Sequence, residues 1–180
     1  MAVLFAGDGF IYSSLNEDMQ GDDYMAISDR MRWLPKWVIE KYDKSMKLYA
    51  VEEIKGNLLL NEGITEALKL IIGDGATAFN NANTYIGVGN GTTAESATQT
   101  GLSGANKKYV KVDSTYPQVS GQKVVFRATF GPDDANFDWR EYTVANGDSD
   151  SAKNLNRKVE NHGTKAQGDT WVVQLEITLS

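Results

Sequence analysis

The chain has 180 residues, no cysteine and a formal net charge of −6 at neutral pH. The length allows one sizeable core, and the lack of cysteine excludes disulfides, thiolate metal sites and thiol nucleophiles. The acidic balance argues against nucleic acid and anionic membranes as general partners, because both select basic surfaces. No basic leader precedes an apolar segment, and no apolar run approaches the ~18 to 20 residues that cross a bilayer, so we expect a soluble protein.

Residues 1–34 predict an extended acidic N-terminal arm. Six acidic side chains and scattered glycines precede Arg30, the first basic residue. A segment of this composition buries little apolar surface, so we expect another subunit to order it; packing on its own domain is the alternative. Within it, residues 28–34 predict a short helix that Pro35 ends.

Residues 35–180 predict one β-rich domain. Residues 37–42 and 46–54 read as two strands joined by a tight turn. Residues 57–73 are expected to hold a packed helix, because apolar residues recur at helical spacing and Gly73 provides a stop. Gly63 lies inside this pattern, where a helix either starts after it or tolerates it at about 1 kcal/mol. We favour a break, or a close backbone approach, at Gly63.

The remainder of the chain predicts short strands. Residues 124–130 and 171–179 alternate apolar and polar side chains, which is typical of antiparallel sheets with one solvated face. Residues 85–89, 137–144 and 155–160 supply further strands. The fold class that follows is α+β, mainly β: an antiparallel β-sandwich or partly open barrel with one packed helix and the N-terminal arm.

The glycines at 87, 89 and 91 superficially resemble a phosphate-binding loop. A dinucleotide fingerprint needs G-x-G-x-x-G opening a helix, whereas Gly87, Gly89 and Gly91 lie in a strand and the following turn. We interpret them as turn glycines that leave room for a neighbouring backbone, and we expect no nucleotide cofactor.

Metal binding is not indicated by the sequence. His162 is the only histidine, so a histidine metal cluster is excluded and a Ser-His-Asp triad would depend on this residue. We expect His162 to make a turn or subunit contact. The pairs Asp133 with Asp134 and Asp148 with Asp150 lack EF-hand spacing and are expected to be solvated.

The densest basic stretch comprises Lys107, Lys108 and Lys111. On a strand these lysines point to both sides, so they do not form one basic face. We interpret the segment as a solvated strand rather than as a phosphate site.

Aromatic side chains offer a second kind of candidate site. Each tryptophan lies beside or within a predicted strand, where core or interface packing accounts for it. The alternative is a sugar-stacking platform in a carbohydrate-binding module. The residues concerned are Trp33, Trp37, Trp139 and Trp171.

Glu141 is the polar residue that stands out. Strand alternation places it on the same face as Phe137 and Trp139, where a carboxylate needs a cationic partner. Arg157 or Lys165 is the expected partner, in a structural ion pair between strands. Glu141 would be a catalytic acid only if it lined a cleft, and a glycosidase needs a second carboxylate that the sequence does not mark. We therefore expect no catalytic residue, with a carboxylate-based hydrolase as the alternative.

Two runs resemble small structural proteins of tailed bacteriophages: NLLLNEG at residues 57–63, and YIGVGNGTTA at residues 85–94 followed by TGL at 100–102. The pattern in that class is a helix before "IG-(V/L)-G-(T/N)-G-T-T-A" and a "T-x-L" segment. The second half of the chain fits as well, through WREYTV around Glu141, Leu155 to Arg157, Gly163 to Lys165, and Trp171. The resemblance covers about residues 37–180.

The resemblance implies a non-enzymatic virion protein made in the bacterial host cytoplasm. The first expectation is a capsid decoration, or cement, protein that binds the major capsid protein through its β-domain and arm. The alternative is a tail, collar or fibre/baseplate adaptor. The resemblance also carries the expectation of a homo-oligomer, with a trimer as its form.

Overall fold

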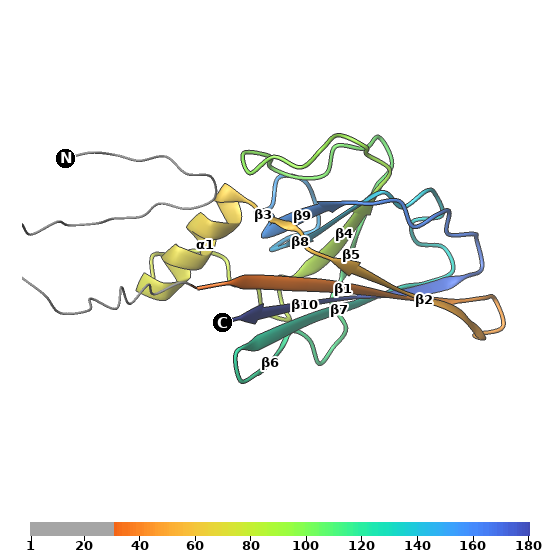
Figure 1. The fold of residues 1–180 in the computed structure, drawn as a ribbon, viewed down its shortest axis with the longest axis horizontal. Helices are drawn as coiled ribbons and strands as arrows, with labels where there is room; N and C mark the ends of the chain where they lie inside the picture. Colours follow the sequence, from red (N-terminus) through yellow and green to blue (C-terminus); the bar gives the residue numbers. More distant parts are fainter. Residues whose placement is uncertain (1–30) are drawn as a thin grey trace, which may run out of the picture. The chain divides into compact units, whose positions relative to one another are not determined.

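Two five-stranded antiparallel sheets face each other in the computed structural model, which describes residues 31–180 (Figure 1). The first sheet has the order β2-β1-β10-β7-β6 and the second the order β3-β9-β8-β4-β5. The first contains β1 (Trp33–Tyr42), β2 (Leu48–Lys55), β6 (Gln118–Ser120), β7 (Lys123–Phe130) and β10 (Thr170–Leu179). The second contains β3 (Leu58–Leu59), β4 (Tyr85–Gly89), β5 (Lys107–Lys111), β8 (Glu141–Ala145) and β9 (Asn156–Val159). The predicted mainly-β sandwich is confirmed.

The core lies between the two sheets and is rich in aromatic rings. The inward residues of β7 and β10, such as Phe126 and Val173, are buried as the alternation predicts. The Trp139 ring packs edge-on against Phe130 and Trp171, with centroids 4.8 Å apart in each pair. Such edge-to-face contacts add to the free energy of burial.

The short helix expected over residues 28–34 is wrong where the structure describes it. Trp33 and Leu34 belong to β1, and Pro35 follows them in the same strand opposite Ile177 of β10. The Pro35 carbonyl accepts from Gly56 N, so proline's missing N–H does not prevent pairing. Residues 31 and 32 are not helical either. Residues 28–30 of that helix, and the predicted arm up to residue 30, lie outside the described residues.

The helix α1 (Asn61–Ile72) runs through Gly63 without a break, so the predicted break is wrong. The predicted close approach is confirmed, because a Cβ on Gly63 would lie 2.6 Å from Leu155 Cα. Residues 58 and 59 form β3 instead of a first helical turn. The helix ends as expected at Gly73, whose φ of 70° and N–H bond to the Leu70 carbonyl form a left-handed cap.

The strand expected over residues 137–144 begins only at Glu141. Irregular chain precedes it, and this shifts the alternation. Trp139 therefore points into the core with Tyr142, 6.3 Å between ring centroids. Glu141 makes its contacts elsewhere, so the prediction that it shares a face with Trp139 is wrong.

Candidate functional site

The charged pair at the centre of the second sheet is fully buried. Glu141 at the start of β8 and Arg157 in β9 each have 0% side-chain exposure. Glu141 Oε2 accepts from Arg157 Nη2 at 2.6 Å and from Nε at 3.2 Å. The predicted ion pair between neighbouring strands thus forms with Arg157 as its cation.

The same carboxylate holds a long loop, residues 90–106, that joins β4 to β5. Glu141 Oε1 accepts from the amides of Gly91 at 3.1 Å and Gly104 at 2.7 Å. Glu141 Oε2 also accepts from the Ser103 amide at 2.9 Å. Arg157 Nη1 donates to Gln99 Oε1 at 2.7 Å. The buried pair therefore fixes both ends and the middle of this loop, like an anion in a nest of backbone amides.

The glycines around this loop allow neighbouring side chains to approach the backbone closely. A Cβ on Gly91 would collide with Ser103 Oγ and Glu141 Oε1, and one on Gly89 with Glu141 Oε1. A Cβ on Gly87 would lie 2.5 Å from Tyr109 Cε1. The prediction that Gly87, Gly89 and Gly91 leave room is right, but the prediction that a backbone fills that room is wrong.

The environment of Glu141 favours a permanent charge. Burial alone would raise its pKa, but the Ser103 amide, Arg157 and the Gly104 amide outweigh burial and lower the pKa. A general acid needs the opposite shift and access to substrate. Glu141 has neither, so its geometry is that of a structural carboxylate.

Lys165 does not take part in this pair, which corrects the other half of the prediction. Its Nζ donates to the Gly131 carbonyl at 2.7 Å and to Asn136 Oδ1 at 2.9 Å. Burial lowers the pKa of Lys165, against the nearby charges of Asp134, Asp169 and Asp133. Lys165 instead ties the loop after β7 to the loop before β10.

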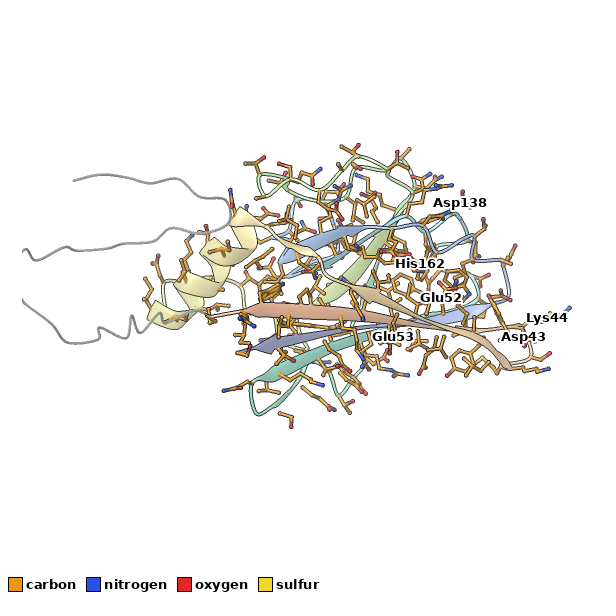
Figure 2. All side chains as sticks on the ribbon, in the orientation of Figure 1. Asp43, Lys44, Glu52, Glu53, Asp138 and His162 are labelled. Carbon is orange, nitrogen blue, oxygen red and sulfur yellow. The ribbon has the colours of Figure 1, made fainter. Side chains whose placement is uncertain are left out.

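His162 lies in a second charged cluster, at the end of the sandwich away from α1, where Figure 2 shows it beside Glu52. His162 Nδ1 is 2.5 Å from Glu52 Oε2, and Lys41 Nζ donates to Glu52 Oε1 at 2.5 Å. The other ring nitrogen faces Glu160 Oε1 at 3.3 Å. A triad needs a hydroxyl nucleophile hydrogen-bonded to that nitrogen, and within residues 31–180 Nε2 has no hydrogen-bond partner.

This cluster connects parts of one chain. Lys41 Nζ also donates to the His162 carbonyl at 2.7 Å and lies 4.3 Å from the centre of the Trp171 ring. Burial would raise the pKa of Glu52, but Lys41 and His162 lower it. His162 lies in the irregular segment between β9 and β10, where no turn is assigned, and its contacts fasten that segment to β1 and β2.

The four tryptophans do not form the sugar-stacking platform that was the alternative to core packing. Trp37, Trp139 and Trp171 are buried in the core, and Trp33 is partly buried with Nε1 donating to Asn57 Oδ1 at 2.9 Å. The core interpretation is confirmed for the first three residues. A sugar ring has no access to those three indoles.

The acidic loops and the basic strand neutralise each other. Asp150 pairs with Lys107 and accepts from Tyr109 Oη at 2.6 Å, and Asp134 pairs with Lys108 at 3.2 Å. No group of three or more histidine or carboxylate side chains within residues 31–180 is arranged to hold a metal ion. Asp150 is therefore better described as a structural residue than as a solvated one.

A depression of about 380 Å³ lies between α1 and residues 146–153. Its lining includes Glu66, Lys69, Asn146 and Lys153. Glu66 is the one carboxylate among the lining residues, and it accepts from Asn146 Nδ2 at 3.4 Å. Hydrolysis of a glycosidic bond by paired carboxylates would require a second acid facing it.

Exposed apolar side chains are the feature that the sequence interpretation missed. The helix was expected to bury its apolar side, yet Gly63 and Glu66 are its buried residues. Ile71 and Ile72 are 79% and 76% exposed. The exposed large apolar residues of α1 are Ile64, Leu68, Leu70, Ile71 and Ile72. A second group follows the β1–β2 hairpin: Met46, Leu48, Tyr49 and Val51.

Comparison with known proteins finds no matching family model, no similar curated protein and no similar solved structure. In residues 31–180, no helix has both the length and the apolarity to cross a bilayer.

Proposed function

We propose that this protein is a non-enzymatic structural subunit of a tailed-phage virion, and that it decorates the capsid as a cement protein. The observation that carries the proposal is the contrast between its buried charged side chains and its exposed apolar side chains. Buried charges are used to fix loops, whereas large apolar side chains are presented outward. Exposed apolar groups of this kind mark protein interaction surfaces.

The loop of residues 90–106 supports the same proposal. It contains the end of the run that resembles phage structural proteins, residues 90–94, together with residues 100–102, and the pair of Glu141 and Arg157 holds it. Thr92, Thr93 and Thr100 of this loop are exposed. A rigid loop with short polar side chains loses little conformational entropy on docking, which suits repeated binding to a lattice.

The N-terminal arm is part of the proposal. In this proposal the arm lies across neighbouring capsid subunits, so that weak contacts add through multivalency. Deleting residues 1–30 should leave the sandwich folded, because β1 begins only at Trp33, and should weaken particle binding. Equal binding by the truncated and full-length proteins would contradict this role for the arm.

A tail, collar or baseplate adaptor is the second candidate. The observation that favours it is the presence of two separate apolar groups, one on α1 and one along the β1–β2 hairpin. An adaptor joins two different neighbours and needs two such surfaces. A capsid decoration protein needs one surface for the lattice and one for its own copies, so the same observation serves both candidates.

Cryo-electron microscopy of particles that lack the protein, after addition of the purified chain, tests the proposal. Regular density over the capsid lattice is the expected result. Density confined to the neck or tail would favour the adaptor. No binding to either part would overturn the virion proposal.

A further inference from the structure

Lys165 differs from the other buried cations of the domain. Lys41 and Arg157 each lie against a carboxylate. Lys165 is 1% exposed, and its Nζ donates to two neutral acceptors, the Gly131 carbonyl and Asn136 Oδ1. In the part of the chain that the structure describes, no carboxylate forms an ion pair with it. A buried cation without a countercharge keeps most of its desolvation cost, so ion pairing does not explain this lysine.

Burial makes the Lys165 amine a better nucleophile. Desolvation lowers its pKa, against the charges of Asp134, Asp169 and Asp133. A lower pKa increases the fraction of neutral amine, which is the form that attacks a carbonyl carbon. Reagents from solution have no access to a side chain that is 1% exposed. The group with which this amine reacts is therefore one of its own neighbours in the fold.

The Asn136 carboxamide is the neighbour that suits such an attack. Its Oδ1 lies 2.9 Å from Nζ, so the carbonyl group is held in contact with the amine. The Gly131 carbonyl is also close, at 2.7 Å, but attack there would break the main chain. A carboxamide instead releases its nitrogen as ammonia. Asn136 is exposed, with Nδ2 bonded to the Pro132 carbonyl at 2.9 Å, so the ammonia can leave into solvent.

The backbone holds the two side chains together. The Lys165 amide donates to the Phe137 carbonyl at 3.2 Å, directly after Asn136 in the chain. On the other side of Asn136, Ala135 has a φ of 53°, a conformation that residues other than glycine rarely adopt. The Ala135 carbonyl accepts from Trp139 Nε1 at 2.8 Å, which fastens this strained residue to the core. Such strain persists where the surrounding structure fixes a particular geometry, here the approach of Asn136 to Lys165.

We propose that Lys165 and Asn136 join through an intramolecular isopeptide bond. The neutral amine attacks Cγ, so that the Nζ–Cγ bond forms and the Cγ–Nδ2 bond breaks. One proton passes from Nζ to Nδ2, and one molecule of ammonia leaves. No oxidant, reductant or other reactant is consumed. The product amide is neutral, which removes the buried charge, and its remaining N–H retains the Gly131 carbonyl as an acceptor.

The bond would close residues 136–165 into a covalent loop that contains β8 and β9. It joins the segment after β7 to the segment before β10, so strands of the second sheet would be tied to strands of the first. A cross-link of this kind reduces the conformational freedom of the unfolded chain. The inference does not rest on the virion proposal, because it concerns the covalent structure of the chain, whereas decoration concerns its binding to a particle.

Mass spectrometry of the purified full-length chain tests the inference. We expect the intact mass to be lower by one ammonia than the mass calculated from the sequence. Trypsin does not cleave after an acylated lysine, so digestion should give a branched peptide that joins residues 128–140 to residues 159–180. An intact mass without this loss, or a linear peptide that ends at Lys165, would overturn the inference. Loss of ammonia without the branched peptide would also overturn it, because asparagine before glycine, as at Asn90 and Asn146, loses ammonia by forming a succinimide.

Three variants assign the bond to this pair. Lys165→Met keeps a long buried side chain without the amine, and Asn136→Ala removes the acceptor at an exposed position. Both should retain the full calculated mass. Lys111→Met on β5 is the matched control, because Lys111 is exposed, and this variant should still lose one ammonia. Circular dichroism checks that each variant is folded. Loss of ammonia in folded Asn136→Ala would overturn the assignment, whether or not Lys165→Met folds.

Discussion

The interior below residues 90–106 and the outer side of α1 reverse the usual placement of side chains. The first encloses a carboxylate and a guanidinium with 0% exposure, and the second leaves isoleucine and leucine side chains in contact with solvent. In the interior, every charge has hydrogen-bond partners that define one loop conformation. At the surface, nothing in residues 31–180 covers the apolar groups. Charge here specifies the conformation of a loop, whereas large apolar side chains of α1 lie outside the core.

The largest expected effect comes from neutralising the interior pair. Glu141→Gln leaves the Arg157 cation buried without its carboxylate and should lower the free energy of unfolding by about 3–5 kcal/mol. Glu53→Gln removes one partner of the exposed pair with Lys36 and should change that free energy by less than about 1 kcal/mol. Urea unfolding monitored by tryptophan fluorescence compares the two variants. Similar losses would mean that the buried pair is not what fixes this region.

A smaller loss should follow from crowding the carboxylate. In Gly91→Ala the new methyl group meets Ser103 Oγ and Glu141 Oε1, and we expect a loss of about 1–3 kcal/mol. Gly131→Ala is the matched control, because its Cβ would have an ordinary 3.5 Å contact with Asp134 Oδ2. Thermal unfolding of both variants measures the difference. A stable Gly91→Ala protein would show that the loop can move away from Glu141.

Acid should weaken the interior in a predictable direction. The folded-state pKa of Glu141 is lowered, so below the usual glutamate range the unfolded chain binds more protons than the folded one. Its stabilising contribution is complete above about pH 4.3 and is lost as the pH falls through the folded-state pKa. Unfolding midpoints at several pH values should therefore fall on acidification, and less steeply in Glu141→Gln. Equal slopes would show that other carboxylates dominate the acid response.

The smallest effect on the single chain is expected at the surface of α1. Ile71 is 79% exposed, so Ile71→Lys should change the free energy of unfolding by no more than about 0.5 kcal/mol. The fully buried Leu60, just before the helix, should lose about 2–5 kcal/mol on Leu60→Ala. Urea unfolding monitored by tryptophan fluorescence measures both variants. A large loss for Ile71→Lys would place this side chain in an intramolecular contact.

Strand periodicity in the sequence was sufficient to predict the sandwich. In β7 and β10 the alternation of Phe126, Ala128 and Phe130, and of Trp171 and Val173, depends only on which side chains face the core. The same logic failed just before β8, because an irregular segment shifts the alternation between Trp139 and Glu141. A period of two carries information only while the chain remains a strand.

The ion pair was half predictable. A carboxylate between apolar neighbours requires a cation, and this requirement pointed to Arg157 and Lys165 equally. Which of the two cations pairs with Glu141 depends on strand pairing, because the pairing of β9 with β8 brings Arg157 to Glu141. Helical spacing likewise predicted α1 but not which side it buries. The close contact of Gly63 with Leu155 fixes that orientation, and it is a tertiary property.

The backbone amides of residues 91, 103 and 104 donate hydrogen bonds to the Glu141 carboxylate, and this should slow their hydrogen exchange. This loop makes few strand contacts of its own, and a surface loop of its length normally exchanges its amide protons through small local openings. Here such an opening would separate a buried carboxylate from the donors that solvate it. These three amides should exchange as slowly as those of the core strands, so the loop opens only when the sandwich itself unfolds.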